Sequence, residues 1–527
     1  MNRCNHRVRF NRLEAVILVL ALTISACAVG PDFEKPDSIL PKQRTWQTGQ
    51  DAAPTVPSQV VAEPMKAEWW SVFNDPMLTE LEKRAVNANL TVLQAAVRLG
   101  QSRAQREIAA ADQFPMLNGN TSYTRQMPSK QGILAVVSGL GRGGSGTIAN
   151  GTGNGGIANG TGIGVIGIPS AKIGPFSLWQ YGFDASWELD LWGRVRRELE
   201  SAEASVEASK ESEQATLLSV MAEVARDYIE LRRIQRLLAI LHQTIETQQE
   251  NLNLTEQKAA RGTVTELDVA QAKTQLANFQ AQTPTFEQQE SQTINQLSLL
   301  LGGQPNALRA ELTTAVPMPP VPPRVPVGVP AELARRRPDI RQAEAQLHAA
   351  TAEIGVSVAN FYPRVTLSGS VGLQGLKLKD MVDWAALQYA IGPSITVPIF
   401  QGGRLMATLE LRKAEQQEAA IVHHNTVLQA WHEVDNALTA YAKEQQRNEF
   451  LAQAAQSNRE ELELARLRYQ GGVSDYLPVL TAQQSLLRSE QDFANSTGTV
   501  ATNLVALYKA LGGGWMPPPE KLDTASR

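Results

Sequence analysis

The residue most clearly suited to a chemical reaction in this chain of 527 residues is Cys27. Residues 24–27 read Ile-Ser-Ala-Cys, a branched apolar residue and two small residues before a cysteine, which is the pattern of a bacterial lipobox. The cysteine of that pattern is acylated and becomes the first residue of the mature chain. We therefore expect a covalent lipid on Cys27 that tethers the protein to a membrane. Ala28 follows in place of an aspartate. In the lipoproteins that this pattern resembles, that choice implies the outer membrane.

The segment before Cys27 has the composition of a signal peptide. An arginine-rich stretch over residues 1–14 precedes the apolar run 15–24, AVILVLALTI. A run of that length is too short to span a bilayer permanently. A cleaved secretory signal over residues 1–26 is therefore favoured over a signal anchor.

No other group of residues has the spacing of a catalytic or metal site. Cys4 and Cys27 are the only cysteines, so the rest of the chain holds no disulfide, thiolate ligand or thiol nucleophile. Three histidines lie near acidic residues without an HExxH spacing, which favours packed or solvated histidines over a metal site; they are His423, His424 and His432. We expect no enzyme, and no cofactor apart from the lipid on Cys27.

The overall composition excludes two further classes of protein. The 49 Lys and Arg residues nearly balance the 53 Asp and Glu residues, so no basic surface indicates a nucleic-acid partner. The mean hydropathy of −0.23 is too low for a polytopic helical membrane protein. Aromatic residues are only 6% of the chain, which indicates few thick globular cores.

Two long segments without glycine or proline, residues 194–261 and 404–470, predict long helices that would each reach ~100 Å. The first carries an apolar residue at every seventh position, as in a coiled-coil seam; these are Leu217, Val224, Leu231, Leu238, Ile245 and Leu252. Each long helix ends at glycines, and a helix of ~35 residues should then run back, over 265–301 or 475–511. Leading helices are expected over about 77–112 and 332–360.

The two long segments belong to a duplicated chain. A shift of 210 residues aligns Gly262 with Gly472, and Leu301-Gly302-Gly303 with Leu511-Gly512-Gly513. A shift of 248 aligns the segments that precede them, and this register indicates a repeated unit of helix, strand, strand, long helix, turn and helix. The predicted division is an N-terminal segment 27–76, a first repeat 77–315, a proline-rich extended linker 316–330, a second repeat 331–515 and a tail 516–527.

Four shorter segments alternate apolar and polar residues and predict strands, at about 116–127, 176–190, 364–375 and 388–400. Strands of ~10 residues with this alternation suit an outer-membrane barrel, with lipid outside and water inside. The alternative is a half-buried soluble sheet. Four strands cannot close a membrane barrel, and an open edge in lipid leaves backbone groups unpaired, so several copies must share one barrel. This arithmetic allows two copies or three.

A glycine-rich segment, residues 131–174, separates the first two predicted strands. It contains a G-x-G-x-x-G pattern from Gly141 to Gly146, but the strand and helix of a dinucleotide-binding unit do not flank it. We interpret the segment as a flexible extracellular loop.

Several short motifs spread over the mature chain occur together in one known family. They are Cys27-Ala28-Val29-Gly30-Pro31-Asp32-Phe33, Trp69-Trp70, Trp187-Glu188-Leu189-Asp190-Leu191-Trp192-Gly193-Arg194, Arg336-Arg337-Pro338-Asp339-Ile340, Pro398-Ile399-Phe400, Arg468-Tyr469, Tyr476-Leu477 and Leu511-Gly512-Gly513-Gly514-Trp515. With them the chain resembles the TolC/OprM family of outer-membrane factors, in particular its lipid-anchored, NodT-type RND efflux lipoproteins. The glycine-rich insertion is the main departure.

The resemblance implies a mainly α-helical fold with a transmembrane β-barrel portion. It implies a homotrimer with a twelve-stranded barrel in outer-membrane lipid and a long α-helical tunnel in the periplasm. Such a channel is the exit duct of a tripartite efflux system and passes drugs or other small solutes from a periplasmic adaptor and an inner-membrane RND-type pump. Polypeptide or metal export, or a periplasmic helical adaptor or scaffold lipoprotein, are the alternatives.

In that family the hairpin tips close the tunnel with a leucine ring and polar links. The matching residues are Leu477, Thr481, Gln484 and Arg468, with Leu267, Asp268 and Gln271 in the first hairpin. Related channels carry an aspartate at the Thr481 position and an arginine at the Gln484 position. The chain should therefore rely on packing of Leu477 more than on a charged lock, and ordinary interhelix packing of Leu477 is the alternative.

The tips themselves are expected to dock the adaptor, because small residues allow a second helical hairpin to approach closely. These residues are Gly262, Thr263, Val264, Thr265, Gly472, Val473, Ser474 and Asp475. The alternative is that they only turn the chain.

Overall fold

The computed structural model describes residues 28–36, 58–61, 63, 68–127, 175–327 and 336–513. The predicted signal peptide, Cys27, the glycine-rich segment 131–174 and the tail 516–527 lie outside the described residues. The chain forms two compact units. The strand unit contains residues up to 29, 109–196 and 358–405, and the helical unit contains residues 30–108, 197–357 and 406 onwards.

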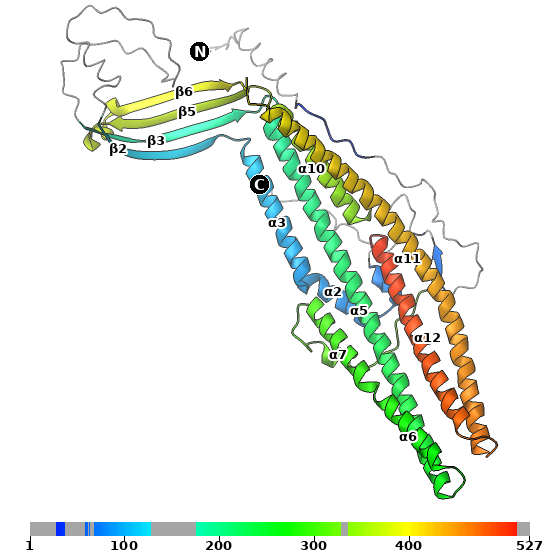
Figure 1. The fold of residues 1–527 in the computed structure, drawn as a ribbon. Coiled ribbons are helices and arrows are strands. Elements are labelled where there is room, and N and C mark those ends of the chain that lie inside the picture. Colours follow the sequence, from blue (N-terminus) through cyan, green and yellow to red (C-terminus); the bar gives the residue numbers. More distant parts are fainter. Residues whose placement is uncertain are drawn as a thin grey trace, which may run out of the picture. The chain divides into compact units, whose positions relative to one another are not determined.

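The strand unit contains a four-stranded antiparallel sheet in the order β2-β3-β5-β6 (Figure 1). Its strands are β2 (Met116–Gln126), β3 (Phe176–Leu189), β5 (Arg364–Gly375) and β6 (Leu387–Thr396). The prediction that the last strand reaches residue 400 is wrong. The pairing ends where Thr396 meets Arg364, the first residue of β5, and Pro398 has no N–H with which to continue a ladder.

The register of the sheet places every odd-numbered residue on one face. Phe183, for example, lies between Gly119 and Val371, and Val371 lies opposite Tyr389. The large side chains of this face include Leu117, Tyr123, Trp179, Tyr181, Phe183, Trp187, Leu367, Val371, Leu373, Tyr389, Ile391 and Ile395. The even-numbered face carries mainly Asn, Ser, Thr, Gln, Gly and acidic residues, and its large apolar side chains lie near strand ends, at Met116, Phe176 and Leu178. The predicted alternation is therefore confirmed.

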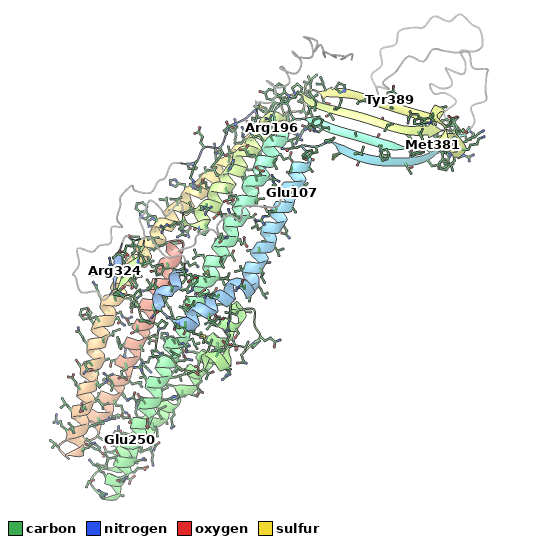
Figure 2. The ribbon with its side chains drawn as sticks, turned by 180° about the vertical axis from the view of Figure 1, so that it is seen from behind. Glu107, Arg196, Glu250, Arg324, Met381 and Tyr389 are labelled. Atoms are coloured by element: carbon green, nitrogen blue, oxygen red, sulfur yellow. The ribbon has the colours of Figure 1, made fainter. Side chains whose placement is uncertain are left out.

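The connection between β5 and β6 contains two short 3₁₀ helices, η3 (Leu378–Val382) and η4 (Trp384–Ala386). The Tyr181 hydroxyl on β3 donates to the carbonyl oxygen of Met381 at 3.5 Å. Figure 2 labels Met381 in this connection and Tyr389 on β6. This hydrogen bond holds the connection against β3.

The helical unit is built around two long helices, α5 (Arg194–Ala260) and α11 (Arg404–Gln470), each of 67 residues. Both predicted long helices are confirmed. Along α5 the residues of the predicted seam are buried or half-buried, and Val224 and Leu231 are fully buried. Within the described residues, no helix has both the length and the apolar character needed to cross a membrane.

The shorter helices differ between the two halves. The second half has single helices, α10 (Pro338–Ala359) before the strands and α12 (Leu477–Ala510) after the long helix. In the first half, α2 (Pro76–Ala88) is followed by α3 (Leu90–Ala111), and α6 (Glu266–Gln280) by α7 (Thr283–Leu300). The prediction of one continuous leading helix and one continuous return helix in the first half is therefore wrong.

Two local features explain these interruptions. Asn89 ends α2 in an extended conformation, and its side-chain oxygen accepts hydrogen bonds from the backbone N–H groups of Thr91 and Val92 at the start of α3. Pro284 lacks an N–H, and a proline ring clashes with the carbonyl four residues earlier, which belongs to Gln280, the last residue of α6.

The middle of the helical unit also holds short elements. β1 (Gln59–Val61) pairs in parallel with β4 (Arg324–Pro326), which lies in the expected proline-rich linker. η1 (Trp69–Phe73) and α8 (Arg309–Leu312) pack into the main apolar core with α2, α5, α11 and α12. Figure 2 labels Arg324 on β4.

Candidate gate and docking surface at the hairpin tips

The two long helices end in the same way at their tips. Gly262 and Gly472 adopt left-handed conformations, with φ of 72° and 71°. The N–H of Thr263 donates to the carbonyl of Lys258 at 3.0 Å, and the N–H of Val473 donates to the carbonyl of Arg468 at 2.9 Å. This is the Schellman termination, in which glycine avoids the strain of a positive φ. The predicted tips are thus glycine turns between antiparallel helices (Figure 1).

The return helices begin differently at the two tips. Thr265 and Asp268 form a capping box, in which Asp268 accepts from the Thr265 backbone N–H at 2.9 Å and Thr265 accepts from the Asp268 N–H at 3.3 Å. α12 has no side-chain hydrogen bond at its cap residue, Tyr476. The structure therefore gives Asp268, a residue of the predicted gate, a local structural partner.

An apolar cluster joins the two hairpins above the tips. It contains Leu252 of α5, Val269, Ala272 and Leu276 of α6, Leu462, Ala465 and Tyr469 of α11, and Tyr476, Val479 and Ala482 beside and on α12. The rings of Tyr469 and Tyr476 have centroids 5.4 Å apart. Lys258 Nζ lies 2.9 Å from the Tyr469 carbonyl oxygen and 3.9 Å from the centre of its ring. This cluster fixes the hairpins against each other within one chain.

Uncharged hydrogen bonds also cross between the hairpins in the same region. Gln484 Nε2 donates to Gln275 Oε1 at 2.8 Å. Asn251 Nδ2 donates to Gln483 Oε1 at 3.4 Å, and Gln248 Nε2 donates to the Tyr476 hydroxyl at 3.2 Å. Burial raises the pKa of Tyr476, which keeps its hydroxyl protonated. The links are therefore neutral.

Sequence reasoning named Gln484 but missed its partner. Gln275 lies four residues after Gln271, which it did name, and residues at that spacing share one face of a helix. Extending the candidate stretch by one turn would have found Gln275.

The other predicted gate residues are not brought together within one chain. Leu477 and Leu267, related by the 210-residue shift, remain 55% and 65% exposed. Thr481 is exposed, and its hydroxyl donates to the Leu477 carbonyl of its own helix at 3.0 Å. Arg468 is exposed, and Gln271 is half-buried.

The predicted docking residues form the outer surface of both turns. Val473 is 73% exposed, whereas Val264 is half-buried and packs against the apolar cluster. A Cβ built on Gly262 or Gly472 would meet no atom within 4 Å. The Thr263 hydroxyl donates to the Lys258 carbonyl at 2.9 Å, and the Ser474 hydroxyl to the Asp475 carbonyl at 3.2 Å. The space around the turns is open to a partner.

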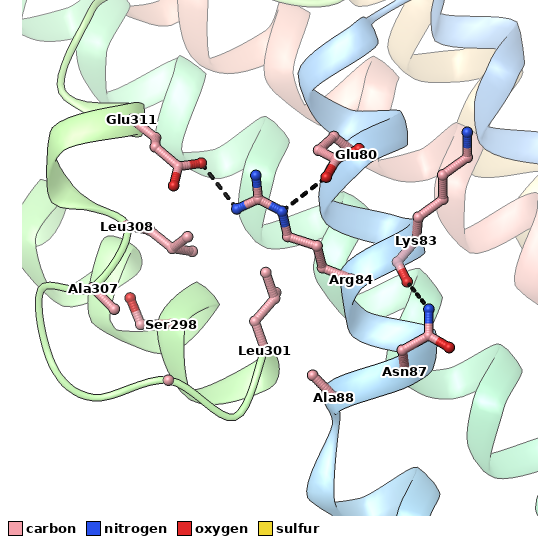
Figure 3. A pocket seen from close by; sticks show the side chains of 11 residues that line it. Glu80, Lys83, Arg84, Asn87, Ala88, Ser298, Leu301, Ala307, Leu308 and Glu311 are labelled. Carbon is pink, nitrogen blue, oxygen red and sulfur yellow. Dashed lines mark hydrogen bonds and ion pairs between the residues drawn. The ribbon is translucent and has the colours of Figure 1, made fainter.

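A cavity of about 580 Å³ between α2 and the segment from α7 to α8 lies away from the tips (Figure 3). Its charged centre is Arg84, whose guanidinium contacts Glu80 at 3.0 Å and Glu311 at 2.9 Å. One guanidinium already satisfied by two carboxylates supplies neither a nucleophile nor a base. Across the described parts of the chain, no group of three His, Cys, Asp or Glu residues is placed to hold a metal ion.

A small sheet with one apolar and one polar face, together with two long helical hairpins that end in open tips, defines a subunit of an outer-membrane channel. The chain belongs to the outer membrane efflux protein family, whose sequence profile matches residues 81–303 and 329–513. The family resemblance of its motifs is thereby confirmed. Its place is the outer membrane, and its family consists of channels rather than enzymes.

Individual relatives agree over nearly the full length. The chain is 30% identical over 498 residues to the outer membrane protein OprJ of Pseudomonas aeruginosa, which covers 94% of this chain and 95% of that protein. It is 30% identical over 507 residues to the toluene efflux pump outer membrane protein TtgI of Pseudomonas putida, with 96% and 99% covered. A solved structure of the outer-membrane channel OprN matches with a TM-score of 0.79 and 31% identity, over 93% of this chain and all of that one.

Proposed function

We propose that this protein is the exit duct of a tripartite efflux system, receiving small solutes from a periplasmic adaptor and an inner-membrane RND-type pump. The observation that carries the proposal is the register of the sheet, which separates an apolar face from a polar one across all four strands. Such a sheet can face lipid on one side and water on the other. The channel itself does no chemistry, and the partner pump supplies the energy.

Three copies would complete the duct. β2 and β6 are the edge strands of the four-stranded sheet. Edges in lipid must find partners because no water is present to satisfy their backbone groups. Pairing β6 of one copy with β2 of the next yields a closed barrel of twelve strands in the trimer.

The cargo we propose is small and amphipathic. Relatives of the chain include a toluene efflux pump protein and an antibiotic efflux pump protein, both from Pseudomonas putida. Molecules of that kind partition into a bilayer, and a water-filled duct gives them a route across it. Export of polypeptides or metal ions is the alternative cargo. Drug susceptibility of a deletion strain, restored by the gene on a plasmid, tests the proposal, and unchanged susceptibility to every amphipathic compound contradicts it.

We assign the gate to the helix ends that carry Leu477, Thr481, Gln484, Arg468, Leu267 and Asp268. In a trimer the exposed Leu477 side chains of three copies would meet at the tunnel end, while the neutral Gln484–Gln275 link holds each pair of hairpins together. Leu477→Ala should therefore raise single-channel conductance in planar bilayers several-fold. Leu464→Ala is the control, because Leu464 is an exposed leucine of the same hairpin, 62% exposed, and lies outside the assigned gate. Equal conductance of both variants contradicts the assignment.

We assign adaptor docking to the outer surface of the turns, from Gly262 to Thr265 and from Gly472 to Asp475. The exposure of Val473 and the open space around both glycines support it. Val473→Asp should abolish crosslinking to the adaptor in cells, and Ser457→Asp, an exposed position further up α11, should leave it intact. Full crosslinking by the Val473 variant would leave the turns with a purely structural role.

We also propose that Cys27 carries the lipid, since it is the cysteine of the lipobox pattern at residues 24–27. Incorporation of labelled palmitate that disappears in Cys27→Ser tests this assignment.

A further inference from the structure

A short extended segment near the N-terminus lies against two helices of the helical unit. We call residues 30–35 the strap. Asp32 pairs with Arg197 of α5, and Lys35 Nζ lies 2.7 Å from Glu344 Oε1 of α10. Between them the ring of Phe33 stacks on the imidazole of His348, also of α10, with centroids 4.4 Å apart and an interplanar angle of 17°. The strap thus occupies the groove between α5 and α10.

A close approach between two glycine backbones fixes the position of the strap. Gly30 has a φ of +98°, and a Cβ built on it would lie 2.5 Å from the Cα of Gly355 on α10. A Cβ built on Gly355 would lie 2.8 Å from Cγ of Arg197. The backbones at Gly30 and Gly355 therefore approach too closely for a side chain at position 30, and a side chain at position 355 would displace the Arg197 side chain.

Side chains of α5 hold in place the groove residues that contact the strap. His348 Nε2 lies 3.0 Å from Glu200 Oε1, so the imidazole under Phe33 is held in place from α5. The same Glu200 accepts from Arg197 at 2.7 Å, which in turn faces Asp32. The Asp32 and Lys35 side chains are 87% and 69% exposed, and exposed ion pairs contribute little. The ring stack and the glycine contact therefore hold the strap, and the ion pairs set its register.

We propose that the groove between α5 and α10 is a recognition site for the N-terminal segment of its own chain, an extended peptide of the pattern Gly-x-Asp-Phe-x-Lys. Cys27 is three residues before Gly30, and an extended chain spans about 3.5 Å per residue, so docking confines residue 27 to within about 10 Å of the glycine contact. Docking then holds the lipid anchor at the helices instead of leaving it on a free tether. This role rests on the proposed acylation of Cys27, whereas the recognition itself does not.

Disulfide trapping in the full-length membrane protein tests the recognition. Outside Cys27 the mature chain has no cysteine, so an engineered pair reports without interference. Lys35→Cys with Glu344→Cys should crosslink rapidly under mild oxidation. The matched control is Glu34→Cys with Glu344→Cys, because neighbouring residues of an extended strap point to opposite sides. A docked strap predicts at least a tenfold difference in rate, and equal rates would overturn the proposal.

Two further variants identify what holds the strap. Phe33→Ala in the crosslinking background should slow the reaction about tenfold, because it removes the ring stack, and Glu34→Ala should leave the rate unchanged. Cys27→Ser, exported with a signal peptide that leaves no lipid, should also crosslink at the original rate. Loss of crosslinking in that variant would mean that the membrane, and not the groove, positions the strap. Efflux is not measured, so failure of the exit-duct proposal leaves this test standing.

Discussion

In each half of the helical unit, a side chain at the leading helix donates a hydrogen bond to the end of the return helix, and we call this contact the joint. The two halves use different side chains for it. In the first half, Asn89 Nδ2 donates to the carbonyl of Leu300, near the end of α7, at 2.7 Å. In the second half, Arg337 Nη1 donates to the carbonyl of Ala510, the last residue of α12, at 2.8 Å. The donors are related by the 248-residue shift and the acceptors by the 210-residue shift. The duplication has preserved the contact while the chemistry of the donor has changed.

The change of donor also changes what the joint holds. Asn89 is neutral and serves both as the donor to Leu300 and as the cap of α3. Arg337 is 8% exposed and, besides Ala510, contacts Asp339 at 2.6 Å and Glu433 of α11 at 2.7 Å. In the second half an ion pair therefore connects the joint to the long helix α11. In the first half the neutral Asn89 makes no such ion pair.

The largest expected effect comes from moving the helix break of the first half into the second. Ala494 corresponds to Pro284 by the 210-residue shift and is buried inside the continuous α12. Ala494→Pro should lower the free energy of unfolding by about 3 kcal/mol or more, because it removes a hydrogen bond and forces a kink into a packed helix. Denaturant unfolding in detergent measures it. Pro284→Ala is the control and should not destabilise, since α6 and α7 already tolerate the break; a large loss there would contradict this reading.

The two joint residues should differ when each is truncated. Arg337→Ala should cost about 2–4 kcal/mol of unfolding free energy, since it leaves Glu433 and the Ala510 carbonyl without their guanidinium. Asn89→Ala should cost about 1–2 kcal/mol, the value of a cap and one hydrogen bond. The same unfolding assay compares them. A cost for Asn89→Ala that equals or exceeds that of Arg337→Ala would show that the ion pair adds nothing to the second joint.

A third comparison concerns pH. Glu211 of α5 is fully buried, 2.7 Å from Arg341 Nη2, and its counterpart Ile421 on α11 is 69% exposed. Burial raises the pKa of Glu211 from 4.5 to about 7, against the opposing charge of Arg341 and with a further rise from Glu207. At a pH between these two values the folded state keeps a proton that the unfolded state has already released. The free energy of unfolding therefore falls as the pH rises through that range.

Glu211→Gln should flatten this dependence, removing roughly 1–2 kcal/mol of the loss between pH 5 and pH 8. Unfolding at a series of pH values measures the slope. Ile421→Gln, at the exposed counterpart, is the control and should leave the slope as it is. An unchanged slope in the Glu211 variant would assign the pH dependence to other groups.

The smallest effect is expected at the caps of the return helices. Thr265→Ala removes one side of the capping box and should cost about 1 kcal/mol locally. Hydrogen exchange at the first turn of α6 should then quicken about fivefold. Asp475→Ala, at the counterpart position, should change little at α12, because α12 has no side-chain cap bond. Equal acceleration at both tips would remove the distinction between them.

The sequence predicted the elements whose signals are periodic. The long helices and the alternating strands lie close to their expected bounds, because burial on one face repeats along the whole element. The breaks at Asn89 and Pro284 were not predicted, although an asparagine and a proline are both local signals for the end of a helix. The pairing of β1 with β4 could not be predicted, since three residues carry no periodicity and their partners are far apart in sequence.

The candidate site was predictable in position and not in detail. The glycine turns follow from Gly262 and Gly472, and the resemblance pointed to Leu477 and Gln484. The partner of Gln484 depends on how the two hairpins pack against each other. Gln275 is one of several glutamines in that stretch, so the sequence alone does not single it out. The strap was named only as a sequence motif, because its contacts with Arg197, His348 and Glu344 join residues distant in sequence.

The neutral links between the hairpins have a consequence for the conditions in which the protein works. Ions weaken interactions between charges at a distance, with a Debye length of about 8 Å at physiological salt, but they leave amide hydrogen bonds largely unaffected. Gln484–Gln275, Asn251–Gln483 and Gln248–Tyr476 carry no net charge. These links between the hairpins should therefore stay nearly constant when the osmolarity and ion content of the surroundings change, as they do for a compartment bounded by a porous outer membrane.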